Sequence, residues 1–359
     1  MEILSPGTRD DVAVTDAAVR LGGWFSGSDM SSCLPHGARI VVIQPGGDTA
    51  TATAAGLVDS DTWLFSEHEP PLSCGGAVHV PIAGGLELPG DELIVADDIY
   101  IQILDYSSLA YLSVAGPTAV RITCLEDLQA FLADADRAMC SGDWSEQLAH
   151  PSVQLADQAA LADPGGRPSP QRVYVTAEGQ VRTGIGGTDL AHIDAGAEAV
   201  AAALDSQETD SSLDAMIPHE RLAQAAADRP WLARYLQALE TRRRLTRRYG
   251  CGIAVSGFGT RFQPGLPKQP AEGAEAPLLL QLARDTYAVR TQDDRLFRLG
   301  RDAARLLEVF AVLPEETALP TAVNLLDMTA QQVARIRADL TARLQLAPGG
   351  SLETDEAAE

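Results

Sequence analysis

Residues 277–300 read PLLLQLARDTYAVRTQDDRLFRLG, a stretch in which three short apolar runs are separated by charged and polar residues. Short apolar runs bounded by turn-forming residues are typical of β-strands. We therefore expect strands at Pro277–Leu282, Tyr287–Arg290 and Leu296–Leu299, with Gly300 ending the third strand.

Beyond Gly300 the apolar residues recur at helical rather than strand spacing. Three helices are predicted, and their apolar faces carry Ala303, Leu306, Leu307 and Phe310 in the first, Leu319, Val323 and Leu326 in the second, and Val333, Ile336, Leu340 and Leu344 in the third. Leu313-Pro314 ends the first helix, and Pro348-Gly349 ends the third. Thr329 and Gln332 have the spacing of a capping box, which indicates that the third helix begins there.

The remainder of the chain predicts an α+β protein. Residues 1–118 alternate apolar runs with Gly and Pro and indicate a β-rich N-terminal domain. Residues 119–250 indicate an α+β to helical middle region, with a hairpin near residues 172–182 and a long helical stretch over residues 218–249 that contains Pro230 as a potential break.

Three further segments follow. Residues 251–276 are rich in Gly and Pro and predict a linker. Residues 277–346 form the module of three strands and three helices. Residues 347–359 end in an acidic sequence that predicts a disordered tail.

Composition excludes several classes of protein. Lys268 is the only lysine of the 359 residues, so a P-loop, a protein kinase and a pyridoxal-phosphate enzyme, which all need a functional lysine, are excluded. The five cysteines and six histidines lack the spacing of a zinc site or a disulfide framework, so we expect reduced thiols, no metal and no cofactor. No catalytic motif is present, and we expect a protein that is not an enzyme.

The formal net charge of −23 argues against general nucleic-acid binding, which requires clustered basic residues. The sequence also lacks a long apolar run and a basic, cleavable leader, so we expect a cytoplasmic protein that does not contact membranes.

Arginines concentrate in two places despite the acidic total. Eight arginines and three acidic residues lie between Glu220 and Arg248. Five more arginines fall on or near the second and third predicted strands and the following helix: Arg290, Arg295, Arg298, Arg301 and Arg305. The first cluster is consistent with contact to an acidic peptide, a partner enzyme or RNA, and the second with contact to an acidic peptide. The alternative for each cluster is a solvated surface of mixed charge.

The order of three strands and three helices resembles the PqqD-like fold, a winged-helix recognition element of pathways that make ribosomally synthesised, post-translationally modified peptides. The resemblance implies that a leader peptide binds as an added strand on the third strand, beside the third helix. By position, it implies an edge formed by Leu296, Phe297, Arg298 and Leu299 together with Arg301, and a groove wall formed by Val333, Ile336 and Arg337. The apolar members of this set are equally consistent with simple core residues.

The whole chain resembles the recognition proteins of daptide-type peptide pathways. The residues that carry this resemblance are the helix Leu125–Asp136, the following His150-Pro151-Ser152-Val153 and the C-terminal module. It implies that the protein binds the leader of a precursor peptide and presents the precursor to separate peptide-modifying enzymes. Two alternatives stay open: a modifying enzyme in the N-terminal part fused to its own leader-binding module, and a winged-helix DNA-binding regulator.

Overall fold

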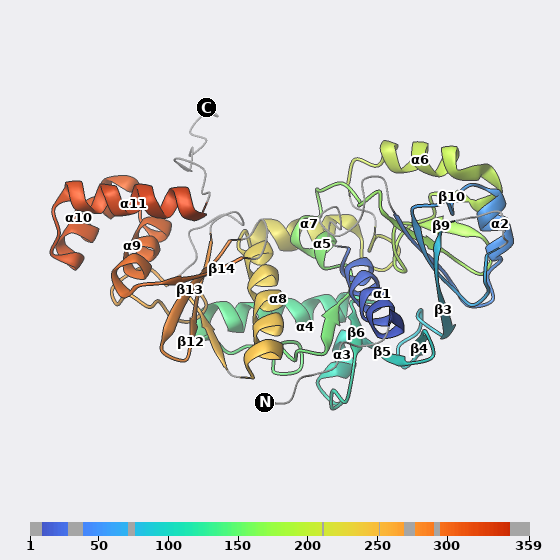
Figure 1. The fold of residues 1–359 in the computed structure, drawn as a ribbon, viewed down its shortest axis with the longest axis horizontal. Coiled ribbons are helices and arrows are strands. Elements are labelled where there is room, and N and C mark those ends of the chain that lie inside the picture. Colours follow the sequence, from blue (N-terminus) through green and yellow to red (C-terminus); the bar gives the residue numbers. More distant parts are fainter. Residues whose placement is uncertain are drawn as a thin grey trace. The chain divides into compact units, whose positions relative to one another are not determined.

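The computed structural model describes residues 9–27, 39–70, 76–209, 212–250, 252–268, 277–290 and 295–344. The chain divides into unit 1, residues 1–132 and 146–230, and unit 2, residues 133–145 and 231–359. Both units combine helices with a β-sheet (Figure 1), so the α+β class is confirmed. Helix α4 (Leu125–Ser141) begins in unit 1 and ends in unit 2.

Unit 1 is built on a sheet of ten strands in the order β10-β9-β8-β1-β2-β3-β4-β5-β6-β7. The strands are β1 (Arg39–Ile43), β2 (Thr62–Ser66), β3 (Val78–Gly84), β4 (Glu92–Val95), β5 (Ile99–Asp105), β6 (Thr118–Arg121), β7 (Val153–Leu155), β8 (Arg172–Val175), β9 (Gln180–Arg182) and β10 (Ala191–His192). Strands β8, β1, β2 and β3 are parallel, as are β5, β6 and β7, and the other pairs are antiparallel.

Strand β1 shows why the centre of this sheet is apolar throughout. Ile40 and Val42 belong to one hydrophobic cluster, and Val41 and Ile43 belong to another. Alternate residues of a strand point to opposite faces, so both faces of β1 are buried. The helices that supply the covering residues include α1 (Arg9–Ser26) on the first face and α2 (Thr49–Ala54) and α6 (Gly196–Ser206) on the second.

The ten-stranded sheet runs across the boundary expected between residues 118 and 119. Its strands extend from Arg39 to His192, so the expected N-terminal domain and the first part of the middle region form a single sheet. The remaining helices of unit 1 are α3 (Tyr106–Leu109), α5 (Gln158–Ala162) and α7 (His219–Asp228).

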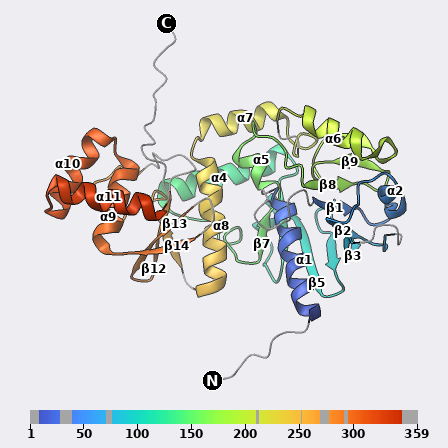
Figure 2. The same cartoon turned by 45° about the horizontal axis from the view of Figure 1, so that its top comes forward.

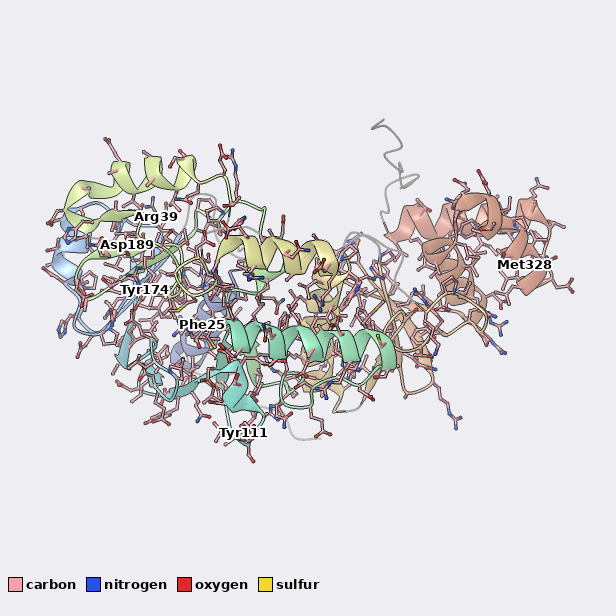
Figure 3. All side chains as sticks on the ribbon, turned by 180° about the vertical axis from the view of Figure 1, so that it is seen from behind. Phe25, Arg39, Tyr111, Tyr174, Asp189 and Met328 are labelled. Carbon is pink, nitrogen blue, oxygen red and sulfur yellow. The ribbon has the colours of Figure 1, made fainter. Side chains whose placement is uncertain are left out.

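A buried ion pair lies inside unit 1. Arg172, at the start of β8, places a guanidinium nitrogen 2.7 Å from a carboxylate oxygen of Asp157, and both side chains are at most 5% exposed. Arg172 also donates to the carbonyl of Phe25 and lies over the Trp24 ring. Phe25 and Tyr174, which lie in the same core of unit 1, are buried, whereas the side chain of Tyr111 is exposed to solvent (Figure 3). The ion pair therefore connects three segments: α1, the segment that follows β7, and strand β8.

Asp127, near the start of α4, joins two further segments of unit 1. Its carboxylate accepts hydrogen bonds from the backbone and hydroxyl of Ser107 and from the backbone and hydroxyl of Thr123. Burial alone raises the pKa of Asp127, but these hydrogen bonds outweigh burial and hold the pKa below its ordinary value of 3.8. Asp127 thereby fixes α3 to the segment between β6 and α4.

We expect Asp127→Asn to lower the free energy of unfolding by about 1–3 kcal/mol at neutral pH, because the amide leaves part of these donors without an acceptor. The folded pKa lies below the unfolded value, so the stabilisation by Asp127 is present above about pH 4 and is lost as the pH falls through the folded pKa. Urea titrations of both proteins at neutral and acidic pH measure the difference. A difference that stays constant down to about pH 2 would contradict this account.

Unit 2 contains an antiparallel sheet of four strands in the order β11-β12-β13-β14: β11 (Ile253–Val255), β12 (Leu278–Leu282), β13 (Asp285–Val289) and β14 (Leu296–Leu299). Its complete helices are α8 (Leu232–Tyr249), α9 (Arg301–Val312), α10 (Glu315–Leu326) and α11 (Ala330–Leu344). The strands lie between α8 on one side and α9, α10 and α11 on the other (Figures 1 and 2).

The three strands and three helices expected in this module are all present. The capping box is confirmed, because the backbone N–H of Gln332 donates to the Thr329 hydroxyl at 3.3 Å and the backbone N–H of Thr329 donates to the Gln332 side chain at 2.9 Å. The break near Pro230 is also confirmed, since α7 ends at Asp228 and α8 begins at Leu232.

The expected linker of residues 251–276 contains a strand. Strand β11 pairs with β12, and the following loop is attached to α9 by the buried carboxylate of Glu308. Glu308 accepts hydrogen bonds from the backbone N–H groups of Phe262 and Gln263 and from the Ser256 hydroxyl. Residues up to 268 therefore belong to the module, while residues 269–276 and the expected tail lie outside the described residues.

Candidate peptide-binding edge

Strand β14 forms one edge of the four-stranded sheet. Within the described residues it pairs only with β13, in a register that places Leu296 opposite Val289 and Leu299 opposite Thr286. An edge strand presents backbone N–H and C=O groups that an additional strand can pair with. Within the described residues, β14 is thus an edge strand with one side available for pairing.

The hydrogen-bond pattern identifies which groups of β14 face outward. The backbone N–H of Arg290 donates to the carbonyl of Arg295 at 3.0 Å, which makes these two residues a hydrogen-bonded pair. Bonded and non-bonded pairs alternate along an antiparallel ladder, so Phe297 and Leu299 bond to β13. The backbone groups of Leu296 and Arg298 point to the open edge.

The two faces of β14 differ in chemistry. Phe297 and Leu299 pack against the hydrophobic cluster formed with α9, α10 and α11. Leu296 and Arg298 alternate with them and belong to the opposite face. Arg298 is exposed and forms an ion pair of 2.7 Å with Asp285, which raises the pKa of the Arg298 guanidinium. A strand added at this edge would therefore place alternate side chains beside Phe297 and Leu299 on one face of the sheet and beside Arg298 on the other face.

The opposite edge of the sheet, β11, is partly covered by a side chain of the same unit. The backbone N–H of Ser256 bonds to the carbonyl of Leu279, so by the same alternation the carbonyl of Ile253 faces away from β12. Arg242 of α8 donates a hydrogen bond to this carbonyl. The module thus covers part of one edge with its own side chain, and within the described residues β14 receives no such cover.

Three of the arginines of α8 have structural roles. Arg234 and Arg243 are buried, and Arg234 donates to the carbonyl of Pro277 at 3.2 Å. Arg242 lies over the Trp144 ring in addition to its bond to Ile253. The solvated surface considered from the sequence is wrong for Arg234 and Arg243, whose side chains are buried within unit 2, and Arg242 is half-buried there.

The expected groove wall on α11 is only partly on the surface. Val333 is fully buried in the core cluster, so its side chain is not presented to a ligand. Ile336 is half-buried against the same cluster. Arg337 lies over the Phe310 ring at 4.3 Å and forms an ion pair of 2.6 Å with Glu315. The side chain of Arg337 therefore contacts α9 through Phe310 and α10 through Glu315.

Leu296, Phe297, Arg298 and Leu299 lie together on the edge strand, and the exposed Arg301 follows directly at the start of α9. Two contacts at this edge were not predicted from the sequence. Asp285 is the ion-pair partner of Arg298, and the buried Arg290 lies over the Phe297 ring at 5.5 Å. Both contacts join β13 to β14, and a predicted antiparallel register would have placed these residues next to each other.

The outward direction of Arg298 leads to a prediction about folding. Proline removes an N–H donor, so it is tolerated in a strand only where that donor faces solvent. We expect Arg298→Pro to retain the fold, whereas Phe297→Pro removes a ladder bond and core packing and unfolds unit 2. Circular dichroism and thermal unfolding of both variants measure this difference. Equal destabilisation by the two prolines would contradict the assigned alternation.

Other kinds of site find no support in the described part of the chain. Among these residues, no group of three or more His, Cys, Asp or Glu side chains could hold a metal ion. None of the described helices has both the length and the apolar character needed to cross a bilayer. Two groups of neighbouring carboxylates, Asp97 with Asp98 and Glu67 with Glu69, are exposed.

Comparison of the chain with protein-family models, with curated proteins and with solved structures finds no match.

Proposed function

We propose that the protein binds a peptide as an added strand on β14 and that the peptide is the leader of a ribosomally made precursor, which the protein presents to separate peptide-modifying enzymes. The observation that carries this proposal is the difference between the two edges of the unit 2 sheet. Arg242 bonds to the outward carbonyl of Ile253 on the β11 edge, whereas the described residues show no such bond to the outward backbone groups of Leu296 and Arg298 on the β14 edge.

The apolar and basic faces of β14 add specificity to this edge. Strand addition uses main-chain hydrogen bonds for affinity and alternate side chains for selection. Phe297 and Leu299 would select apolar residues at every second position of the peptide, and Arg298 would favour acidic residues between them. DNA reading is less well supported, because Arg337 and Arg343 of α11 are each paired with a carboxylate.

Binding of peptides selected from a random library tests the proposal. Titration of fluorescent selected peptides should show a loss of affinity of about two- to tenfold for Arg298→Pro, because proline removes one outward main-chain bond worth about 0.5–1.5 kcal/mol and 1.4 kcal/mol is tenfold in Kd. Arg298→Ala is the matched control, since it removes the same side chain and keeps the backbone donor.

Arg298→Ala should therefore lose less affinity than Arg298→Pro, and a folded Ile336→Glu variant should report whether the peptide also contacts α11. Selected peptides that bind wild type and Arg298→Pro equally would refute strand addition on β14.

A further inference from the structure

Arg298 is paired with a carboxylate of its own sheet and still exposes most of its side chain. Its Nη2 donates to Oδ1 of Asp285 at 2.7 Å, while the Arg298 side chain is 70% exposed and the Asp285 side chain is 43% exposed. A guanidinium carries five N–H donors, and the described contact with Asp285 uses one nitrogen. Arg298 can therefore receive a second carboxylate that arrives from the open edge.

The position opposite Arg298 in an added strand is closer to Arg298 than Asp285 is. Arg298 lies opposite Tyr287 in the pairing of β13 with β14, so Asp285 is its diagonal neighbour on the same face. Diagonal neighbours have Cα atoms about 7–8 Å apart, whereas two residues that exchange both backbone hydrogen bonds are about 5.5 Å apart. Because the backbone groups of Arg298 point to the open edge, the residue that an antiparallel strand places opposite Arg298 belongs to the closer class.

The charge around this edge favours an acidic strand over a second copy of the chain. Between Arg284 and Arg305 the sequence contains six arginines and four aspartates. Arg298 and Arg301 are exposed on β14 and at the start of α9. Pairing of β14 with the β14 of a second copy would bring these arginines together, whereas a carboxylate opposite Arg298 adds an attractive contact.

Antiparallel pairing sets the order of the side chains that the edge would select. All described strand pairs of this sheet are antiparallel, and antiparallel pairing is the more stable arrangement per residue. Read from its N-terminus, an added strand would place four successive residues opposite Leu299, Arg298, Phe297 and Leu296. Leu299, Phe297 and Leu296 are half-buried, so apolar residues fit the first, third and fourth positions and a carboxylate fits the second.

We propose that the bound leader strand carries an acidic residue opposite Arg298 with apolar residues on both sides of it, and that Asp285 is a specificity-determining residue that competes with this acidic residue for the guanidinium. The inference deepens the proposed function and rests on it, because it names the side chain that β14 selects. A strand with a neutral residue at this position leaves Arg298 with Asp285. An acidic strand shares the guanidinium with Asp285, so Asp285 limits how tightly acidic strands bind.

Two fluorescein-labelled peptides, GSTVEVLTSG and GSTVQVLTSG, are the probes. They differ only in a glutamate or a glutamine at the position to be placed opposite Arg298, so the ratio of their dissociation constants isolates the effect of the carboxylate. We expect the glutamate peptide to bind the full chain about twofold more tightly than the glutamine peptide does at low salt, which lies within the range of an exposed ion pair.

Three variants of the full chain, each checked for folding by circular dichroism, are titrated beside it by fluorescence anisotropy. Asp285→Asn removes the competitor, so the ratio should rise to about fivefold, the upper end for an exposed ion pair. Arg298→Ala should bring the ratio to about one. Asp327→Asn is the matched control, because it removes the same charge from an exposed residue between α10 and α11 and should keep the wild-type ratio.

Three results would overturn the inference: a wild-type ratio of one, a ratio that survives Arg298→Ala, and equal ratios in the wild type and Asp285→Asn. Failure of both peptides to bind would also overturn it. Peptides selected from the random library separate these results from failure of the proposed function. If the selected peptides bind and lose affinity in Arg298→Pro, strand addition on β14 stands and the carboxylate requirement alone is refuted.

Discussion

Glu308→Ala is expected to lower the free energy of unfolding of unit 2 by about 3–5 kcal/mol. The Glu308 side chain is buried and accepts hydrogen bonds from two backbone N–H groups and one hydroxyl. Each buried donor left without an acceptor costs about 1–3 kcal/mol. Hydrogen exchange of the amides in β11, β12 and β13 measures the loss, because these strands form the sheet to which the loop is attached.

Glu315→Ala is the matched control for this variant. Glu315 begins α10, is exposed and pairs with Arg337 at the surface, so its removal should cost at most about 1 kcal/mol. A loss in Glu308→Ala no larger than that in Glu315→Ala would show that the loop after β11 is held by other contacts.

Arg172→Met is expected to lower the free energy of unfolding of unit 1 by about 3–5 kcal/mol, because it leaves the buried carboxylate of Asp157 without its ion-pair partner. The guanidinium also bonds to the carbonyl of Phe25. Guanidinium chloride unfolding followed by hydrogen exchange in β1 and β8 measures the change in unit 1.

Combining Arg172→Met with Asp157→Asn should recover part of the loss, because no buried charge is then left alone. Asparagine is chosen since Asp157 has a φ of 51°, a backbone conformation that Asn adopts readily. Strictly additive losses in the double variant would show that the two residues do not stabilise unit 1 as a pair.

The elements that the sequence predicts well are those with a local signal. Strands β12, β13 and β14 follow apolar runs separated by polar breaks, and α11 begins at its own capping box. Pro230 separates α7 from α8 because proline lacks an N–H donor and disfavours a helical residue before it. Each of these signals is contained within a few residues.

Strand β11 could not be predicted in the same way. Ile253-Ala254-Val255 is a run of three residues between Gly252 and Gly257, which by itself is typical of a linker. Its strand conformation depends on pairing with β12, and the carboxylate of Glu308, about fifty residues later in the chain, stabilises the loop that follows. Non-local partners of this kind leave no local pattern.

The expected domain boundary at residue 118 does not coincide with an end of the sheet, and the reason is again a non-local strand pairing. Strand β8 pairs with β1 although more than a hundred residues separate them in the sequence, so the sheet joins segments that composition assigns to different domains. The candidate edge of Leu296–Leu299 followed from the strand order, whereas the burial of Val333 depends on how α11 packs against α9 and α10.

Unit 2 is formed by two separate segments of the chain, residues 133–145 and 231–359, and this limits which fragments can fold. A fragment that begins at Pro277 would omit α8, whose Arg234 bonds to Pro277, and would also omit β11 and the loop that Glu308 holds. Leu278, Leu280 and Leu282 alternate along β12 on the face away from α9 and are buried in the full chain. Expression of residues 277–346 alone is therefore expected to yield an insoluble polypeptide, whereas the full unit 2 consists of residues 133–145 and 231–359.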